Sequence, residues 1–244
     1  MNLTIDIGNT NITFGIFKDN NLLKRLSLPT RPYCYNIFLS KLFRHYAFEA
    51  VIAASVVPDA TKALENALKE LRVKKPLILG KNLVVPIKNL YQFPKQVGQD
   101  RLVNAFAAIE LYGAPAIVVD YGTAITFDAI SAKKEYLGGL ILPGIETSLA
   151  ALEEKTALLP RIKLSQPPKN MIGRNTRQSM LSGVIFGFAS LTQGIVAQLK
   201  LELGKNTRVI GTGGNIQLIS PYCPVFQAQD INLTLKGLNL ILKK

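Results

Sequence analysis

The sequence predicts an α/β fold with mixed sheets, arranged as two similar lobes. The main observation is a duplicated motif, in which an apolar strand delivers an aspartate, a glycine and small polar residues into a turn, and a second apolar strand follows. Asp6 occupies this place in the first copy, and Asp120 occupies it 114 residues later. In both halves, strand-like apolar runs also alternate with helical segments, which is typical of α/β proteins.

Each element of the N-terminal half follows from periodicity and from turn residues. Alternating apolar residues around a glycine-containing turn predict a hairpin, prolines break the chain after it, and Asp59 is placed to cap a helix. In order, we expect a hairpin and returning strand through residue 28, a helix at 36–46, a buried strand at 49–57, a helix at 60–71, a strand at 76–79, a loop at 82–99 and a helix at 101–112.

The C-terminal half repeats this order, beginning with its own hairpin. The same patterns predict a hairpin at 116–127, a strand at 134–142, a helix at 148–155, a loop at 159–175, a long helix at 176–200, a strand at 208–211 and a C-terminal helix at 233–242. The Tyr-Gly-Ala-Pro sequence at 112–115 separates the repeats. We therefore expect one lobe over residues 1–113 and a second over residues 114–244, which together are long enough for two small domains.

The net charge of +13 raises nucleic acid as a partner, but its distribution argues against one. The balance is +7 over residues 1–113 and +6 over residues 114–244, and no basic run exceeds two residues. No basic arm or alternation of aromatic and basic residues is present, so scattered solvated Lys and Arg are the better interpretation.

Two isolated cysteines, Cys34 and Cys223, fit a reducing compartment, and the N-terminus begins directly with a strand rather than a signal sequence. Residues 178–199 carry no charge and are long enough to cross a bilayer. They also contain several Gln, Ser and Thr residues, and Gly183 and Gly187 are spaced for close helix packing. We expect a core or interface helix, no membrane partner and a cytoplasmic location.

The two hairpins have the residues that a nucleotide site requires. A carboxylate at a hairpin mouth can hold a metal ion, the glycine allows close approach of a phosphate, and Asn, Thr and backbone N–H groups supply donors. A single histidine makes a Ser-His-Asp triad very improbable, and no P-loop motif is present. Gly211-Thr212-Gly213-Gly214-Asn215 is either a flexible turn or a nucleotide contact.

The segment Gly98-Gln99-Asp100-Arg101 opens a predicted helix. By spacing alone, Asp100 is as easily an N-cap as a functional group. However, a carboxylate base beside a guanidinium suits phosphoryl transfer to a hydroxyl, because the first orients and deprotonates the alcohol and the second binds anionic charge. Thr176, before the uncharged helix, is either its cap or a ligand for a carboxylate.

Taken together, these motifs resemble the type III pantothenate kinases, a family within the actin, hexokinase and heat-shock ATPase superfamily. The resemblance covers nearly the whole chain and implies two ribonuclease-H-like lobes, a duplicated actin-like ATPase fold. Its motifs, in order, are Asp6-Ile7-Gly8-Asn9-Thr10, Tyr91 with Gly98-Gln99-Asp100-Arg101, Asp120-Tyr121-Gly122-Thr123-Ala124, the strand and turn at 138–144, the segment 156–160, Gly173-Arg174-Asn175-Thr176 and Thr212-Gly213-Gly214.

The resemblance implies ATP-dependent phosphorylation of pantothenate to 4′-phosphopantothenate, the first step of coenzyme A biosynthesis, with Asp100 as the base. Asp6 would hold magnesium, Asp120 would hold a monovalent cation, potassium or ammonium, and the enzyme would be a homodimer with the pantothenate pocket shared across its interface. The residues implied to bind the ATP phosphates are Asp6, Gly8, Asn9, Thr10, Asn11, Thr13 and Thr123. Those implied to bind pantothenate are Tyr91, Gly98, Gln99, Asp100, Arg101 and Thr176.

A regulatory relative that keeps the fold but controls transcription is the alternative. The presence of Asp6, Asp100, Arg101, Asp120 and Thr176 favours the enzyme, since a scaffold would not need all of them.

Overall fold

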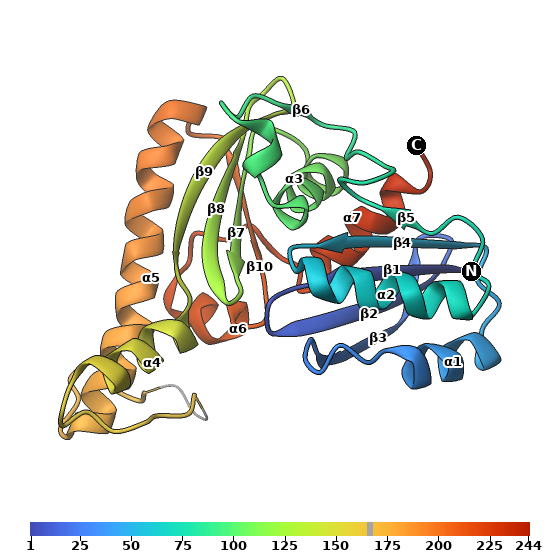
Figure 1. Cartoon of the computed structure of the whole chain (residues 1–244). Coiled ribbons are helices and arrows are strands. Elements are labelled where there is room, and N and C mark those ends of the chain that lie inside the picture. Colours follow the sequence, from blue (N-terminus) through green and yellow to red (C-terminus); the bar gives the residue numbers. More distant parts are fainter. Residues whose placement is uncertain (165–167) are drawn as a thin grey trace. The chain divides into compact units, whose positions relative to one another are not determined.

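The structure, a computed structural model, describes residues 1–164 and 168–244, and the chain forms two compact units (Figure 1). Residues 165–167 of the predicted loop at 159–175 lie outside the described residues. The first unit comprises residues 1–111 and 232–244, and the second comprises residues 112–231. The prediction that residues 232–244 belong to the C-terminal lobe was therefore wrong.

The first unit is built on the sheet β3-β2-β1-β4-β5, in which β1, β2 and β3 are antiparallel and β1, β4 and β5 are parallel. Its strands are β1 (Asn2–Ile7), β2 (Asn11–Lys18), β3 (Asn21–Pro29), β4 (Ala50–Ser55) and β5 (Leu77–Ile78), and the short strand β6 (Lys88–Asn89) follows in the chain. Its helices are α1 (Asn36–His45), α2 (Pro58–Glu70), the single turn η1 (Pro94–Gln96), α3 (Gln99–Tyr112) and α7 (Leu233–Ile241).

The two faces of this sheet are covered by different helices. Leu3, Ile5 and Ile7 alternate along β1 onto the face where α1 and α2 pack, and they are fully buried. The opposite face of the sheet packs against α7, and Gly15 of β2 leaves room there for Leu235. At Gly237, α7 approaches α3 so closely that a Cβ atom would lie 2.7 Å from Val103 Cγ1. The C-terminal helix is thus part of the first unit's core.

Five strands of the second unit pair in the order β9-β8-β7-β10-β11, which repeats the strand order and directions of the first unit. Its strands are β7 (Ala116–Tyr121), β8 (Ala124–Ile130), β9 (Glu135–Pro143), β10 (Arg208–Thr212) and β11 (Ala228–Gln229). Its helices are α4 (Ile145–Lys155), α5 (Thr176–Leu203), α6 (Ile216–Ile219) and the turn η2 (Ser220–Tyr222). The expected duplicated mixed α/β fold is confirmed, and α5 runs along this sheet over a core that includes Ile117, Val119 and Phe127 (Figure 1).

Candidate active site

The first hairpin places Asp6 at the C-terminal end of β1. Asp6 lies opposite Thr13 of β2 and beside Ala54 of the parallel strand β4. The turn is closed by the Gly8 N–H, which donates to the Asn11 carbonyl at 2.9 Å. Asn9, Thr10 and Asn11 are exposed at the turn, while the strands on both sides are buried. The arrangement is a β-hairpin that presents small polar residues to solvent, as the sequence predicts.

Asp100 lies near the same edge of the first sheet. Gly98, two residues before it, packs near Val56, whose N–H donates to the Ile7 carbonyl at 3.1 Å, directly after β1 and β4 end. The side chain of Gln99 packs against Gly80, which follows β5. The start of α3 is thus held at the carboxyl ends of three parallel strands, the edge at which open α/β sheets bind ligands.

Asp100 is not the cap of α3. The helix begins at Gln99, so Asp100 lies inside its first turn, where its Oδ1 accepts the Arg101 N–H at 2.8 Å. A Cβ atom on Gly98 would lie 2.4 Å from this oxygen, so only glycine leaves the carboxylate in place. Burial raises the pKa of Asp100, against the opposing effects of the Arg101 N–H and guanidinium. A raised carboxyl pKa is a property that general bases require.

The other residues expected to bind pantothenate within the first unit differ in exposure. Arg101 is largely buried, with 8% of its surface exposed. Tyr91 is partly buried in the loop before η1, where its N–H donates to Asn89 Oδ1 at 3.0 Å. These residues come from the segment that precedes and opens α3.

In the second unit, Asp120 occupies the position in β7 that Asp6 occupies in β1. It lies opposite Thr126 of β8 and beside Thr212 of the parallel strand β10. Gly213 has a φ of +91°, and a Cβ atom there would lie 2.4 Å from Asp120 Oδ1. By its sequence, this glycine-rich segment is either a flexible turn or a nucleotide contact. The structure shows a turn that passes directly against the Asp120 carboxylate, a contact that the sequence does not predict.

The turn of the second hairpin is anchored by α4. The Thr123 carbonyl accepts the Gly144 N–H at 3.0 Å and the Thr147 hydroxyl at 2.9 Å. A Cβ atom on Gly144 would lie 2.4 Å from the same oxygen, so glycine is required at this crossing. Thr123 itself is exposed.

Thr176 is the first residue of α5 and is exposed, but it is not the helix cap. Asn175 is the cap, because its side chain accepts the Gln178 N–H at 2.9 Å, and Gln178 Oε1 in turn accepts the Arg174 N–H at 2.9 Å. Of the two interpretations of Thr176, capping is therefore wrong. Its hydroxyl lies at a helix N-terminus, where backbone N–H groups favour anions.

Metal binding at the candidate site would rest on one or two carboxylates, because the described residues hold no larger cluster of protein ligands. Within residues 1–164 and 168–244, no group of three or more His, Cys, Asp or Glu side chains could hold a metal ion. Mg²⁺ is often bound through one or two carboxylates together with substrate phosphates and waters. The partly exposed Asp6, at a turn of small polar residues, fits that mode of binding.

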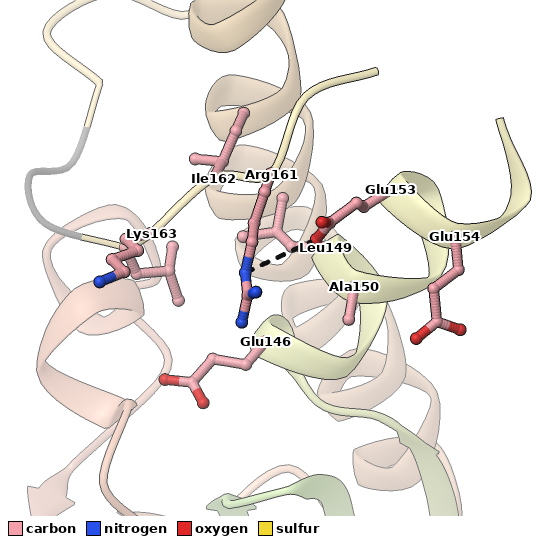
Figure 2. Close-up of a pocket in the computed structure, with 9 residues that line it drawn as sticks. Glu146, Leu149, Ala150, Glu153, Glu154, Arg161, Ile162 and Lys163 are labelled. Atoms are coloured by element: carbon pink, nitrogen blue, oxygen red, sulfur yellow. Dashed lines mark ion pairs between the residues drawn. The ribbon is translucent and has the colours of Figure 1, made fainter. Parts of the chain in front are cut away.

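One pocket in the second unit lies outside the predicted site. It has a volume of about 580 Å³ and lies between α4 and the segment that follows it, where Arg161 Nε is 3.8 Å from Glu153 Oε2 (Figure 2). Its lining residues include Glu146, Leu149 and Lys163, and it contains none of the residues predicted to bind ATP or pantothenate.

The long helix α5 is rich in apolar residues. By length and composition it could cross a membrane, since an 18-residue window has a mean hydropathy of 1.6, and 44% of this window is buried. The exposed positions of α5 include Gly183, Gly187, Ser190, Gly194 and Ala197. Core helices of soluble proteins share such a composition, so composition does not identify a span.

Comparison with solved structures defines the class. MreB 5 of Spiroplasma citri bound to AMPPNP matches with a TM-score of 0.53 and 11% identity, covering 99% of this chain and 96% of that one. A protein from Campylobacter jejuni, assigned to the Baf family of transcriptional activators, matches with a TM-score of 0.56 and 24% identity over 99% of this chain and 96% of that one. The two units, each with a carboxylate at its hairpin, therefore have a duplicated actin-like fold.

Sequence comparison defines the family. A family model described as type III pantothenate kinase matches residues 2–198. The type III pantothenate kinase of Halalkalibacterium halodurans is 41% identical, covering all of this chain and 99% of the relative, and that of Syntrophobacter fumaroxidans is 39% identical, covering 100% and 98%. The chain belongs to the type III pantothenate kinases.

Proposed function

We propose that this protein transfers the γ-phosphoryl group of ATP to the primary hydroxyl of pantothenate and forms 4′-phosphopantothenate, in the first step of coenzyme A biosynthesis. The observation that carries the proposal is the identity of about 40% with curated type III pantothenate kinases over the whole chain. The structure supports it further, because Asp100 and Arg101 are positioned at the strand edge where α/β proteins bind ligands.

In this proposal, Asp100 is the catalytic base. Its carboxylate accepts the proton of the pantothenate hydroxyl as the oxygen attacks the γ-phosphorus, and the bond to the β,γ-bridging oxygen breaks, releasing ADP. Gly98 leaves room for the carboxylate, and the raised pKa brings it nearer to the value a base needs. Arg101 binds anionic charge on the substrates, and Tyr91, Gln99 and Thr176 complete the pantothenate contacts.

The hairpins hold the nucleotide. Gly8, Asn9, Thr10, Asn11 and Thr13 of the first hairpin bind the phosphates in this proposal, and Thr123 is the residue of the second hairpin that is proposed as a phosphate ligand. Asp6 would hold a magnesium ion, which when bound neutralises charge on the β- and γ-phosphates. Phosphoryl transfer depends mostly on such positioning and electrostatic stabilisation, and these residues supply both.

A coupled assay tests the function directly. Purified protein with pantothenate, ATP and magnesium should release ADP and form a phosphorylated pantothenate detectable by mass spectrometry. ATP hydrolysis that does not depend on pantothenate, with no phosphorylated product, would refute the proposal and favour the regulatory alternative.

Asp120 is proposed to bind a monovalent cation, and activity should depend on that ion. The carboxylate lies among the hydroxyl-bearing residues Thr126 and Thr212 and against the Gly213 turn, which suits a large, weakly hydrated ion such as potassium or ammonium. We expect turnover to rise severalfold when potassium or ammonium replaces sodium at constant ionic strength. Asp120→Ala should be slow in every salt. Equal wild-type rates in sodium and potassium would contradict the assignment.

The homodimer is proposed to form through α5. Its exposed residues Gly183, Gly187, Ser190, Gly194 and Ala197 follow heptad-like spacing along one helix face. A Cβ atom at any of the three glycines would have no atom within 4 Å, so the helix presents an open stripe of small residues that a second α5 can approach closely. This packing also accounts for the apolar character of α5 without a membrane and agrees with a cytoplasmic enzyme.

A leucine in this stripe should dissociate the dimer. Gly187→Leu adds bulk where the two backbones would approach, so light scattering after gel filtration should give a monomer mass. Because we propose that the pantothenate pocket is shared across the interface, activity should also fall. Lys62→Leu is the matched control, since it adds the same side chain to the exposed face of α2. A dimer mass for Gly187→Leu would exclude α5 as the interface.

A further inference from the structure

The phosphate-binding turn of the first hairpin is held by a residue outside it, Thr30, which directly follows β3. The Thr30 hydroxyl donates to the Gly8 carbonyl at 2.6 Å, and its backbone N–H donates to the Thr10 carbonyl at 2.9 Å. One residue therefore binds the carbonyl groups on both sides of Asn9. The sequence motifs did not indicate this role.

Thr30 is itself firmly fixed. Only 1% of its surface is exposed, and its carbonyl accepts the Tyr35 hydroxyl at 2.7 Å. Tyr35 is equally buried, in the core between the sheet and α1. The contacts run without a break from the core through Tyr35 and Thr30 to the turn. Thr30 thus transmits the rigidity of the core to an otherwise exposed turn.

This anchoring determines the direction of a backbone donor. A trans peptide group holds its C=O and the following N–H on opposite sides, and the Gly8–Asn9 peptide bond is trans. Since the Gly8 carbonyl faces Thr30, the Asn9 N–H is directed away from Thr30. Loss of the hydroxyl would leave the Gly8 carbonyl without this donor and allow the peptide plane to rotate.

The second hairpin has a similar contact, one position further along its turn. There the Thr147 hydroxyl donates to the Thr123 carbonyl at 2.9 Å, again from a residue outside the hairpin. The two threonines come from different elements, since Thr30 follows a strand and Thr147 lies in α4. In both turns, therefore, a threonine hydroxyl donates to a backbone carbonyl of the turn. The two threonines do not occupy equivalent positions in the duplicated segments.

We propose that Thr30 is a positioning residue for ATP, because its hydroxyl fixes the Gly8 peptide group and so aims the Asn9 N–H at the nucleotide phosphates. The inference rests on the proposed function only in assigning ATP phosphates to this turn. Thr30 does not contact the nucleotide itself. Its effect should therefore appear in nucleotide binding and not in the binding of pantothenate.

Thr30→Val and Thr30→Ser form a matched pair, because valine keeps the size of threonine without the hydroxyl and serine keeps the hydroxyl. We expect Thr30→Val to raise the KM for ATP by about tenfold, the scale of losing one donor to a partly buried carbonyl, while the KM for pantothenate stays within about twofold. Thr30→Ser should restore the KM for ATP to within about twofold to threefold of wild type. Equal KM values for ATP in wild type and Thr30→Val would overturn the proposal.

Direct nucleotide binding separates this inference from the proposed function. The Kd for a non-hydrolysable ATP analogue, measured by calorimetry without pantothenate, should rise about tenfold in Thr30→Val and not in Thr30→Ser. This result is expected even if the wild-type protein fails to phosphorylate pantothenate, in which case only the proposed function fails. A valine variant that melts at a lower temperature but binds the analogue as tightly as wild type would reduce Thr30 to a structural residue and overturn the inference.

Discussion

Replacing Asp100 with asparagine is expected to lower kcat by about 10²- to 10⁴-fold, the usual scale for loss of a general base. Asparagine has nearly the same size and can still accept the Arg101 N–H, so the start of α3 should keep its structure. It cannot accept the hydroxyl proton. Steady-state kinetics with both substrates would show a fall in kcat with little change in the KM values. A variant with near-normal kcat would exclude Asp100 as the base.

The thermal stability of Asp100→Asn should also differ from that of wild type, in a way that depends on pH. Because burial raises the pKa of Asp100 in the folded protein, ionisation of this group opposes folding. The protonated Asp100 carboxyl contributes to the free energy of unfolding, and this contribution is fully present below the pKa of the unfolded state, about 3.9. It is lost as the pH rises through the raised pKa of Asp100 in the folded state. Asp100→Asn lacks this loss, so its Tm should equal that of wild type near pH 4 and exceed it at pH 7 to 8. A lower Tm at neutral pH would mean that the favourable effect of the Arg101 charge outweighs the cost of burial.

Replacing Asp6 with asparagine should lower kcat, because it removes the carboxylate proposed to hold magnesium. The proposed ion has a single protein carboxylate at this turn, and a bound metal stabilises the transition state by several kcal/mol. Since about 1.4 kcal/mol is a factor of ten in rate, we expect kcat to fall by about 10²-fold or more. The magnesium concentration for half-maximal activity should also rise. Titration of activity against magnesium, with circular dichroism to verify folding, measures both.

The matched comparison for Asp6 is Asp19, an exposed aspartate in the turn between β2 and β3. Asp19→Asn removes the same charge from the same unit but lies beyond the opposite end of β2 from the turn at residues 8–10. It should leave both kcat and the magnesium requirement unchanged. If Asp6→Asn keeps the wild-type magnesium profile, the first hairpin has only a structural role and the ion must be held elsewhere.

The local elements and the duplication could be predicted from the sequence alone, because they depend on patterns between near neighbours. Alternating apolar residues around Gly8 and Gly122 predict the two hairpins without information from the rest of the chain. Asp6 and Asp120 were found for the same reason, since a carboxylate that ends a buried strand is a local signal. The motif around Asp100, together with the other motifs in their order along the chain, likewise indicated the family to which the chain belongs.

The position of the C-terminal helix depended on tertiary packing. The apolar residues Leu233, Leu235 and Leu238 show that α7 must be buried, but a helical pattern does not say against which sheet. The helix α7 packs in the first unit because its side chains fit the surface there. Gly237 allows α7 to approach Val103 of α3, and Leu235 fits beside Gly15.

The residues that fix the geometry of the candidate site are also brought to it by contacts between residues far apart in the sequence. The sequence by itself identified the side chains that we propose carry the chemistry, namely Asp6, Asp100 and Asp120. Only the tertiary structure decided what holds them, such as Thr30 on the Gly8 carbonyl and Gly213 against the Asp120 carboxylate. The physical reason is that a strand or turn is specified by residues a few positions apart, whereas a hydrogen bond to a buried carbonyl depends on where the whole chain brings its donors.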